Sequence, residues 1–272
     1  MKLSVSNIAW APEADESVYR RMQALGFTGL EIAPTRIFPE NPYDRTPEAA
    51  AFAADLRARY GFTVSSMQSI WYGRTEQVFG TPAERAQLTA YTKKAVDFAA
   101  ALGCRNLVFG CPRSRVLPAG ADAAAAIPFF RELGEYAAGR GTVIAMEANP
   151  PMYGTNYINT TAEALALIRE VGSAGFRLNL DIGTMIANGE DLSVLRGAEQ
   201  QIHHMHLSEP GLVPVSRRPL HRELADFLRS FGYGGFVSVE AARPKDPAAL
   251  EEMLAYAAEI FGGPTEAIKN AT

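Results

Sequence analysis

The chain has 272 residues, of which 47% are hydrophobic and 21% are charged, and its formal net charge is −4. This length suits a single α/β barrel, and the apolar fraction supports a substantial core. The acidic balance argues against a nucleic-acid-binding protein, which usually has a strongly basic face. No run approaches the ~20 apolar residues that span a bilayer. The first ten residues are expected to form a strand rather than a secretion signal.

Cys104 and Cys111 are the only two cysteines, and their spacing fits no metal-binding or redox motif. Free thiols are the expected state, and they favour a cytoplasmic location, where thiols stay reduced. A disulfide between the two residues is the alternative.

Strand-like runs alternate with helical runs rich in Ala, Leu and Glu along the first half of the chain. The predicted strands are 3–8, 28–32, 62–66 and 106–109, and the predicted helices are 15–25, 47–60, a segment starting near 82, and 121–138. Pro82 suits a first helical turn. Gly26 and Gly61 follow two of the helices, where glycine readily adopts the positive φ of a helix end.

The alternation continues in the second half, where four further strands end at Glu147, Asp181, Leu207 and Glu240. Their helices are predicted at 161–171, 192–200, 220–231 and 247–260. Eight strand–helix units in sequence predict an α/β fold, a single (β/α)8 TIM barrel with residues 1–272 as one domain. A doubly wound open sheet is the alternative, but it would not bring these four strand ends together as readily.

Residues that commonly bind metals stand at or near the ends of these four strands: Glu147, Asp181, His206 and Glu240. In a parallel barrel the carboxyl ends of the strands converge on one rim, where active sites form. Carboxylates and an imidazole make a site for Mn²⁺, Mg²⁺, Co²⁺ or Zn²⁺ and leave positions for substrate. His204 shares a strand face with His206, but it lies further from the strand end and is expected to pack beneath the ligand.

At these residues the sequence resembles the sugar phosphate isomerase/epimerase superfamily, also called the xylose isomerase-like or endonuclease IV-like TIM barrels. The resemblance covers nearly the whole chain, from the segment GFTGLEI at 26–32 to GYGGFVSVE at 232–240, and includes the ordered Glu, Asp, His, Glu quartet. It implies that Glu147, Asp181, His206 and Glu240 bind one divalent metal ion. It also implies that Glu147 and Glu240 face opposite sides of a bound sugar as an acid/base pair. Relatives suggest a homo-oligomer.

The sequence departs from the ketose 3-epimerases of this superfamily at two positions. Those enzymes have a His three residues after the sixth-strand Asp, where this chain has Thr184, and a Glu six residues after the fifth-strand Glu, where it has Tyr153. Both family residues contact the substrate near its reacting oxygens. The departures weaken the case for 3-epimerase activity more than the case for metal binding. Endonuclease IV-like repair is disfavoured too, because four histidines are too few for its multi-zinc site.

Several polar or aromatic residues on the expected active rim are predicted to contact the substrate. They are Asn149, Tyr153, Thr184, Arg217 and Trp71. Arg217 is one of four arginines on the predicted rim loops, with those at 113, 115 and 218, and arginine pairs bidentately with phosphate or carboxylate. These arginines favour an anionic substrate; the alternative for each residue is an ordinary loop or packing role.

The sequence therefore predicts a divalent-metal-dependent isomerase or epimerase of a sugar, sugar phosphate or related hydroxy-ketone. A carboxylate would remove a proton beside a carbonyl, and the cation would stabilise the resulting enediolate. A lyase that dehydrates a keto-polyol on the same scaffold is the first alternative, and a non-catalytic sugar-binding barrel is another. The expected partner is a small carbohydrate, with neither nucleic acid nor membrane.

Overall fold

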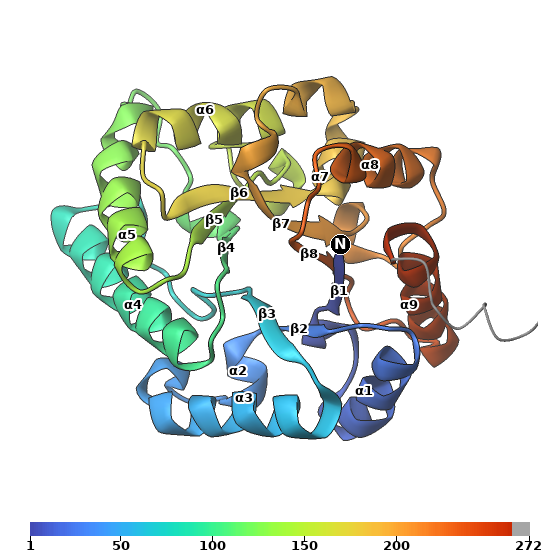
Figure 1. The fold of residues 1–272 in the computed structure, drawn as a ribbon. Helices are drawn as coiled ribbons and strands as arrows, with labels where there is room; N and C mark the ends of the chain where they lie inside the picture. The colour runs from blue at the N-terminus through green and yellow to red at the C-terminus, as the bar shows by residue number, and fades with distance from the viewer. Residues whose placement is uncertain (263–272) are drawn as a thin grey trace, which may run out of the picture.

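Eight parallel strands form one nearly closed barrel in the computed structural model, which describes residues 1–262 (Figure 1). The strands are β1 (Lys2–Val5), β2 (Gly29–Ile32), β3 (Thr63–Met67), β4 (Leu107–Phe109), β5 (Ile144–Glu147), β6 (Phe176–Asp181), β7 (Ile202–Leu207) and β8 (Phe236–Val239). Hydrogen bonds join them in the order β1-β8-β7-β6-β5-β4-β3-β2. β1 and β2 also meet, because the Thr28 N–H donates to the Leu3 carbonyl at 3.1 Å and Ser6 bridges to Glu31. The predicted TIM barrel is confirmed.

Helices surround this barrel (Figure 1). They are α1 (Asp15–Ala24), α2 (Pro34–Ile37), α3 (Thr46–Tyr60), α4 (Pro82–Ala101), α5 (Ile127–Gly139), α6 (Thr161–Val171), α7 (Ile182–Asn188), α8 (Pro219–Ser230) and α9 (Pro247–Phe261). Two begin with complete capping boxes, Thr81 with Glu84 and Thr160 with Glu163, which satisfy the free N–H groups of the first turn. Within residues 1–262, no helix is long and apolar enough to cross a bilayer.

The helix after β6 lies elsewhere than predicted. The expected helix at 192–200 is wrong: that segment holds only short 3-10 turns, at 192–195 and 199–201. The true helix, α7, starts at Ile182 immediately after the strand, because the Asp181 side chain accepts the Gly183 N–H at 3.1 Å and caps it. Gly189, with φ of 63°, then ends the helix. The departure matters for function, because Asp181 is both a strand end and a helix cap.

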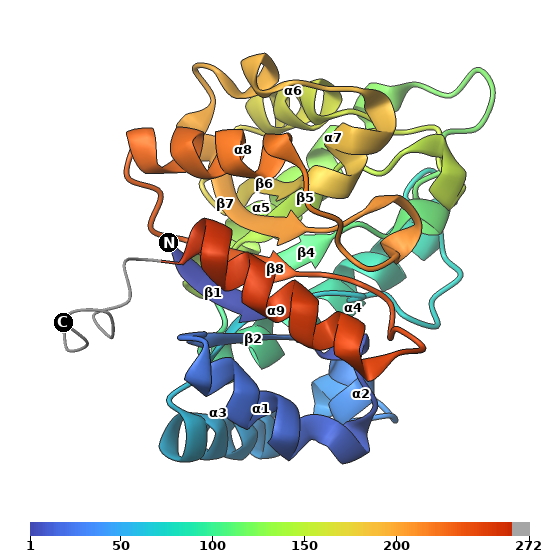
Figure 2. The same cartoon turned by 90° about the vertical axis from the view of Figure 1, so that its right-hand side faces the viewer.

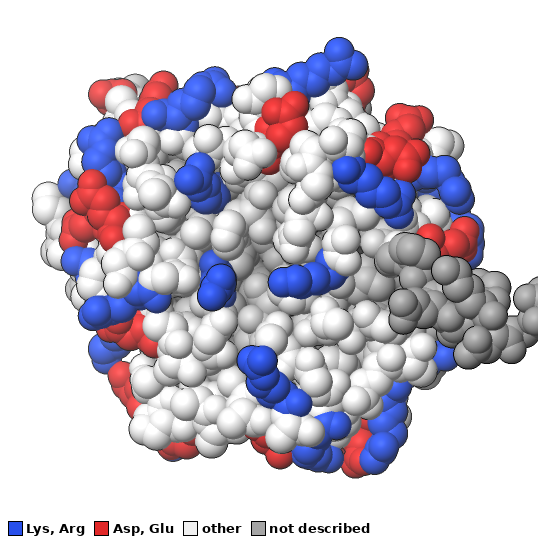
Figure 3. Space-filling model, viewed as in Figure 1, with Lys and Arg blue, Asp and Glu red and all other residues white. Residues whose placement is uncertain are grey.

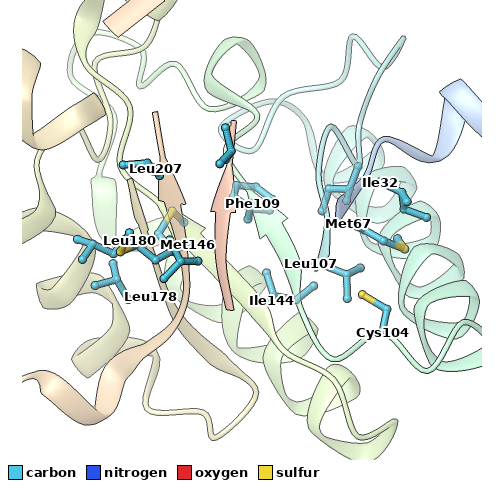
Figure 4. Close-up of a cluster of buried hydrophobic side chains, with 14 of the residues drawn as sticks. Ile32, Met67, Cys104, Leu107, Phe109, Ile144, Met146, Leu178, Leu180 and Leu207 are labelled. Atoms are coloured by element: carbon cyan, nitrogen blue, oxygen red, sulfur yellow. The ribbon is translucent and has the colours of Figure 1, made fainter. Parts of the chain in front are cut away.

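The apolar core lies between the strands and the helices. Phe130 on α5 packs against Phe109 of β4 and Phe176 of β6, with ring centroids 5.0 and 5.2 Å apart. Figure 4 shows neighbouring residues of this layer, among them Met146, Leu178 and Leu180. All of these side chains are at most 1% exposed. The layer fixes the angle at which α5 crosses the strands, and it thereby positions the strand ends.

The inside of the barrel is polar, unlike the branched apolar filling usual in this fold. Its buried side chains include Ser4, Glu31, Asn179, His204 and Ser238, all at most 1% exposed. Strand alternation produces this division. The imidazole of His204 points inward and reaches Glu31 on the opposite strand at 3.0 Å, whereas alternate strand residues such as Leu178 and Leu180 belong to the outer apolar layer (Figure 4).

The two ends of the barrel differ. Figure 2 shows that the strands run away from the end where the N-terminus and the last turn of α9 lie. Figure 3 looks onto that end, where Lys and Arg side chains surround a central hollow. The hollow, of about 440 Å³, is lined by the starts of strands and by Lys2, Arg57 and Arg105. The predicted site residues lie at the opposite end, where the strands finish.

Replacing Phe130 with Ala should lower the free energy of unfolding by about 3–5 kcal/mol, because it leaves a cavity between α5 and the barrel. The matched control is Tyr72→Ala, since the Tyr72 side chain is 71% exposed and its loss should change stability by no more than about 0.5 kcal/mol. Urea unfolding followed by circular dichroism measures both variants. Equal effects of the two substitutions would contradict the packing described for Phe130.

Candidate active site

Glu147, His206 and Glu240 meet at the carboxyl ends of β5, β7 and β8. The Nδ1 atom of His206 lies 2.9 Å from Glu147 Oε1 and 3.2 Å from Glu240 Oε2. One ligand atom of each residue falls within 4.8 Å of the others. All three residues are buried, with at most 8% exposure. The fold thus brings three of the four predicted metal ligands into bonding reach of one another.

Asp181, the fourth predicted ligand, lies beside this cluster but outside that group of three. β6 pairs with β7 so that Asp181 is opposite His206. Its carboxylate accepts hydrogen bonds from the Thr184 hydroxyl at 2.9 Å, the Gly183 N–H at 3.1 Å and the Ser208 hydroxyl. Thr184, which was predicted to contact the substrate, instead hydrogen-bonds to the Asp181 carboxylate in this structure. Its hydroxyl also lies 2.8 Å from the carbonyl oxygen of Ala148, as a second acceptor.

A small cavity opens onto these carboxylates. Its volume is about 160 Å³, and its lining includes Glu147, Asp181 and Glu240 as well as Gln68, Ser69, Val108, Gly110, Cys111, Pro112, Asn149, Tyr153 and Leu212. Three of the lining residues that are not glycine have positive φ: Ser69 at 53°, Cys111 at 43° and Leu212 at 55°. Such conformations cost energy and cluster at functional sites. The loops that line the cavity therefore contain backbone conformations that are held in place by the surrounding structure.

Glu147 is held in place by a network of buried donors. Asn149 donates to its Oε2 at 2.9 Å and Asn179 to its Oε1 at 2.7 Å. Arg115, which is fully buried, donates to Asn149 Oδ1 at 2.7 Å and to the Glu147 carbonyl at 3.0 Å. Arg115 is one of the loop arginines predicted to favour an anionic substrate. In the structure its guanidinium instead ties the β4–α5 segment to the end of β5.

Burial shifts the ionisation of the cluster. It raises the pKa of Glu240 to about 7, and it raises the pKa of Asp181 to about 6, with the nearby Glu147 carboxylate adding to the second effect. Burial lowers the pKa of His206, but the carboxylates of Glu240, Glu31 and Glu147 outweigh it and leave that pKa well above the usual value. Near neutral pH the cluster therefore includes a carboxyl group able to both give and take a proton.

The chain matches a family model described as a xylose isomerase-like TIM barrel over residues 19–260. The chain belongs to this family. No curated protein matches it in sequence.

Solved structures of xylose isomerase-like barrels share the fold at low sequence identity. A D-psicose 3-epimerase is 18% identical with a TM-score of 0.77, covering 97% of this chain and 100% of its own. A 3-keto-D-glucoside 4-epimerase from E. coli is 21% identical with a TM-score of 0.73, covering 94% and 98%. A probable 3-DHS dehydratase from Bacillus anthracis is 14% identical with a TM-score of 0.68, covering 97% and 100%. These TM-scores establish the shared fold.

The remaining predicted substrate residues of this xylose isomerase-like barrel divide into two groups. Asn149 and Tyr153 line the cavity, and the Tyr153 hydroxyl accepts the Gly211 N–H at 2.8 Å, which joins two rim loops. Trp71 and Arg217 do not line the cavity. Trp71 is buried against Phe109 at 4.7 Å and donates its indole N–H to Thr92 at 2.8 Å.

Arg217 is exposed and has its own partners away from the cavity. Its guanidinium pairs with Glu259 on α9 at 2.8 Å and lies over the Tyr256 ring at 4.7 Å. Glu259 lies near the end of α9, which runs back toward the start of the barrel (Figure 2). The sequence placed Arg217 on the rim because its loop follows β7, but the ion pair draws the side chain outward.

The free energy of unfolding of the metal-free protein should depend on pH through Glu240. Between pH 4.5 and 7 the folded state keeps a proton on Glu240 that the unfolded state releases, so raising the pH destabilises the fold in this window. Glu240→Gln removes the effect. Relative to that variant, the wild type should lose on the order of 2–3 kcal/mol across the window. Urea unfolding in chelator at several pH values measures the difference.

The matched control for this titration is Glu252→Gln, which changes an exposed glutamate on α9. A constant difference between wild type and Glu240→Gln across the window would contradict the proton assigned to Glu240.

Proposed function

We propose that the protein is a divalent-metal-dependent isomerase or epimerase of a sugar or related hydroxy-ketone, acting through an enediolate. The observation that carries this proposal is that two buried glutamates, Glu147 and Glu240, both contact the Nδ1 atom of His206. Both glutamates also line one small cavity. Membership of the xylose isomerase-like family and fold neighbours that include sugar epimerases support it.

The donor set fits a divalent cation. Two carboxylates and an imidazole converge within 4.8 Å, and Asp181 supplies a third carboxylate on the neighbouring strand. Oxygen donors with one nitrogen suit Mn²⁺, Mg²⁺, Co²⁺ or Zn²⁺. Without a cation, three buried carboxylates lie close together with the His206 imidazole among them and Arg115 nearby, an arrangement that is costly in a low dielectric. A bound ion would supply Lewis-acid stabilisation of the negative charge that develops on the substrate.

The residues of the chain supply the proton transfers. One of the two glutamates removes the proton beside the carbonyl, and the other returns a proton from the opposite face, which inverts that carbon and gives epimerisation. Return of the proton to the adjacent carbon gives aldose–ketose isomerisation instead. Glu240 suits this role because its carboxylate lines the cavity together with that of Glu147. Glu147 is kept in position by Asn149 and Asn179.

The cavity also limits the substrate. A volume of about 160 Å³ suits a reacting unit the size of one monosaccharide, and Asn149 and Tyr153 offer hydrogen bonds to its hydroxyls. The described residues of the lining include no Lys or Arg. An anionic group on the substrate would therefore lie outside this cavity, on the surrounding loops.

A dehydratase is the second candidate. The fold neighbours include a probable 3-DHS dehydratase, and a carboxyl group that lines the cavity, such as Glu240, could protonate a departing hydroxyl. The products separate the two reactions, because dehydration removes the mass of one water and isomerisation removes none.

The proposal predicts about one equivalent of a divalent ion in freshly purified protein, measured by plasma mass spectrometry, and its loss in His206→Ala. Incubation with keto-sugars in D₂O should place deuterium on carbon.

Glu240→Gln should lower turnover by about 10²–10⁴-fold, because it removes a general acid/base. The control is Glu252→Gln, on the exposed face of α9. Near-normal turnover in Glu240→Gln would refute the mechanism. Wild-type protein that binds none of Mn²⁺, Mg²⁺, Co²⁺ and Zn²⁺ after incubation with each ion would also refute it.

A further inference from the structure

Glu31 is a buried carboxylate that the proposed reaction leaves without a role. It lies on β2, on the far side of the barrel from β5 to β7, and it is 0% exposed. Its Oε2 atom is 2.9 Å from His206 Nε2 and 3.0 Å from His204 Nε2. None of the described Lys or Arg side chains forms an ion pair with it; the two imidazoles are its partners.

The two imidazoles do not contact Glu31 equally. The His206 contact has the geometry of a hydrogen bond, whereas the His204 nitrogen is close to the carboxylate but poorly aligned with it. The second carboxylate oxygen, Oε1, has no hydrogen-bond partner among the described residues. Glu31 is therefore arranged chiefly around His206.

His206 uses its two nitrogens in opposite directions. Nδ1 faces Glu147 and Glu240 at the cavity, and Nε2 faces Glu31 in the barrel interior. A carboxylate that accepts the N–H of a metal-binding histidine fixes the ring orientation and tautomer and makes the ring a stronger donor. A ring that donates from Nε2 to Glu31 leaves Nδ1, on the cavity side, to bind an ion.

We propose that Glu31 is a positioning residue: it holds the His206 ring so that Nδ1 points at the Glu147–Glu240 pair, and it thereby strengthens binding of a divalent cation there. The inference rests on the proposed metal-dependent function. It extends the metal site by one residue that contacts neither the ion nor the substrate.

A purely structural role would not require this residue. Removing one partner of a buried ion pair destabilises a fold when it leaves the other charge unpaired. Here the carboxylates of Glu147 and Glu240 still lie beside the His206 ring after Glu31 is changed. Glu31→Gln keeps the shape and one acceptor oxygen but removes the charge. On structural grounds alone it should therefore leave a stable, folded barrel.

The test is the affinity of metal-free protein for Mn²⁺ and Co²⁺ by titration calorimetry, with folding checked by circular dichroism. Glu31→Gln should weaken binding by about 10–100-fold, the loss usual for such partners. The matched control, His204→Gln, removes the other imidazole beside Glu31 and leaves the His206 contact, so it should change affinity less than about threefold. In Co²⁺-loaded wild type, the imidazole N–H of His206 should exchange slowly with solvent in paramagnetic NMR.

The outcomes separate this inference from the proposed function. Wild type that binds Co²⁺ while Glu31→Gln binds it equally well overturns the role of Glu31 and leaves the metal site standing. An equal loss in Glu31→Gln and His204→Gln also overturns it, because the effect would then be general disruption of the interior. Fast exchange of the His206 N–H in wild type does so without any variant. Wild type that binds no cation overturns the proposed function and this inference together.

Discussion

Four carboxylates, those of Glu31, Glu147, Asp181 and Glu240, share the buried end of one barrel with the imidazole of His206. Charges of one sign cannot be held this close in a low dielectric unless each is protonated or given a partner. Burial keeps a proton on Glu240 below a pKa of about 7 and on Asp181 below about 6. The rest of the site follows from this constraint.

The residues around the carboxylates stabilise them by donating hydrogen bonds. Glu147 accepts hydrogen bonds from the amide groups of Asn149 and Asn179. Asp181 accepts them from two hydroxyls and from one backbone N–H of α7, that of Gly183. Arg115 also stabilises this network, because its guanidinium donates hydrogen bonds to the Glu147 carbonyl and to the side chain of Asn149. The polar interior of the barrel is thus a consequence of burying these carboxylates, and it explains why apolar residues do not fill the barrel as they usually do in this fold.

The sequence predicted the features that depend on periodicity. Parallel strands must end on one rim, so residues that close successive strands, such as Glu147 and Asp181, are brought together by the fold alone. The same reasoning identified the barrel and seven of the helices that follow its strands. It failed after β6, because Asp181 both closes the strand and caps a helix that begins at the next residue, so no loop separates the two elements.

Side-chain direction was the part that sequence could not supply. Glu31 belongs to a segment read only as a family resemblance, and its contact with His206 joins residues on opposite walls of the barrel. Arg115, Arg217 and Trp71 all follow strands, yet the first turns into the protein, the second turns out toward Glu259, and the third packs on Phe109. Each direction is decided by a partner distant in sequence, which no local pattern encodes.

The direct junction between β6 and α7 has an evolutionary consequence. Because α7 starts at the residue after Asp181, any insertion there would displace a carboxylate of the site. The connections from β3 to α4 and from β5 to α6 are long by comparison, and their turns, including Ser69 and Tyr153, line the cavity. Loops of this kind accept changes in length. Changes in these loops would therefore alter the cavity lining while Glu147, Asp181 and Glu240 stay in place at the strand ends.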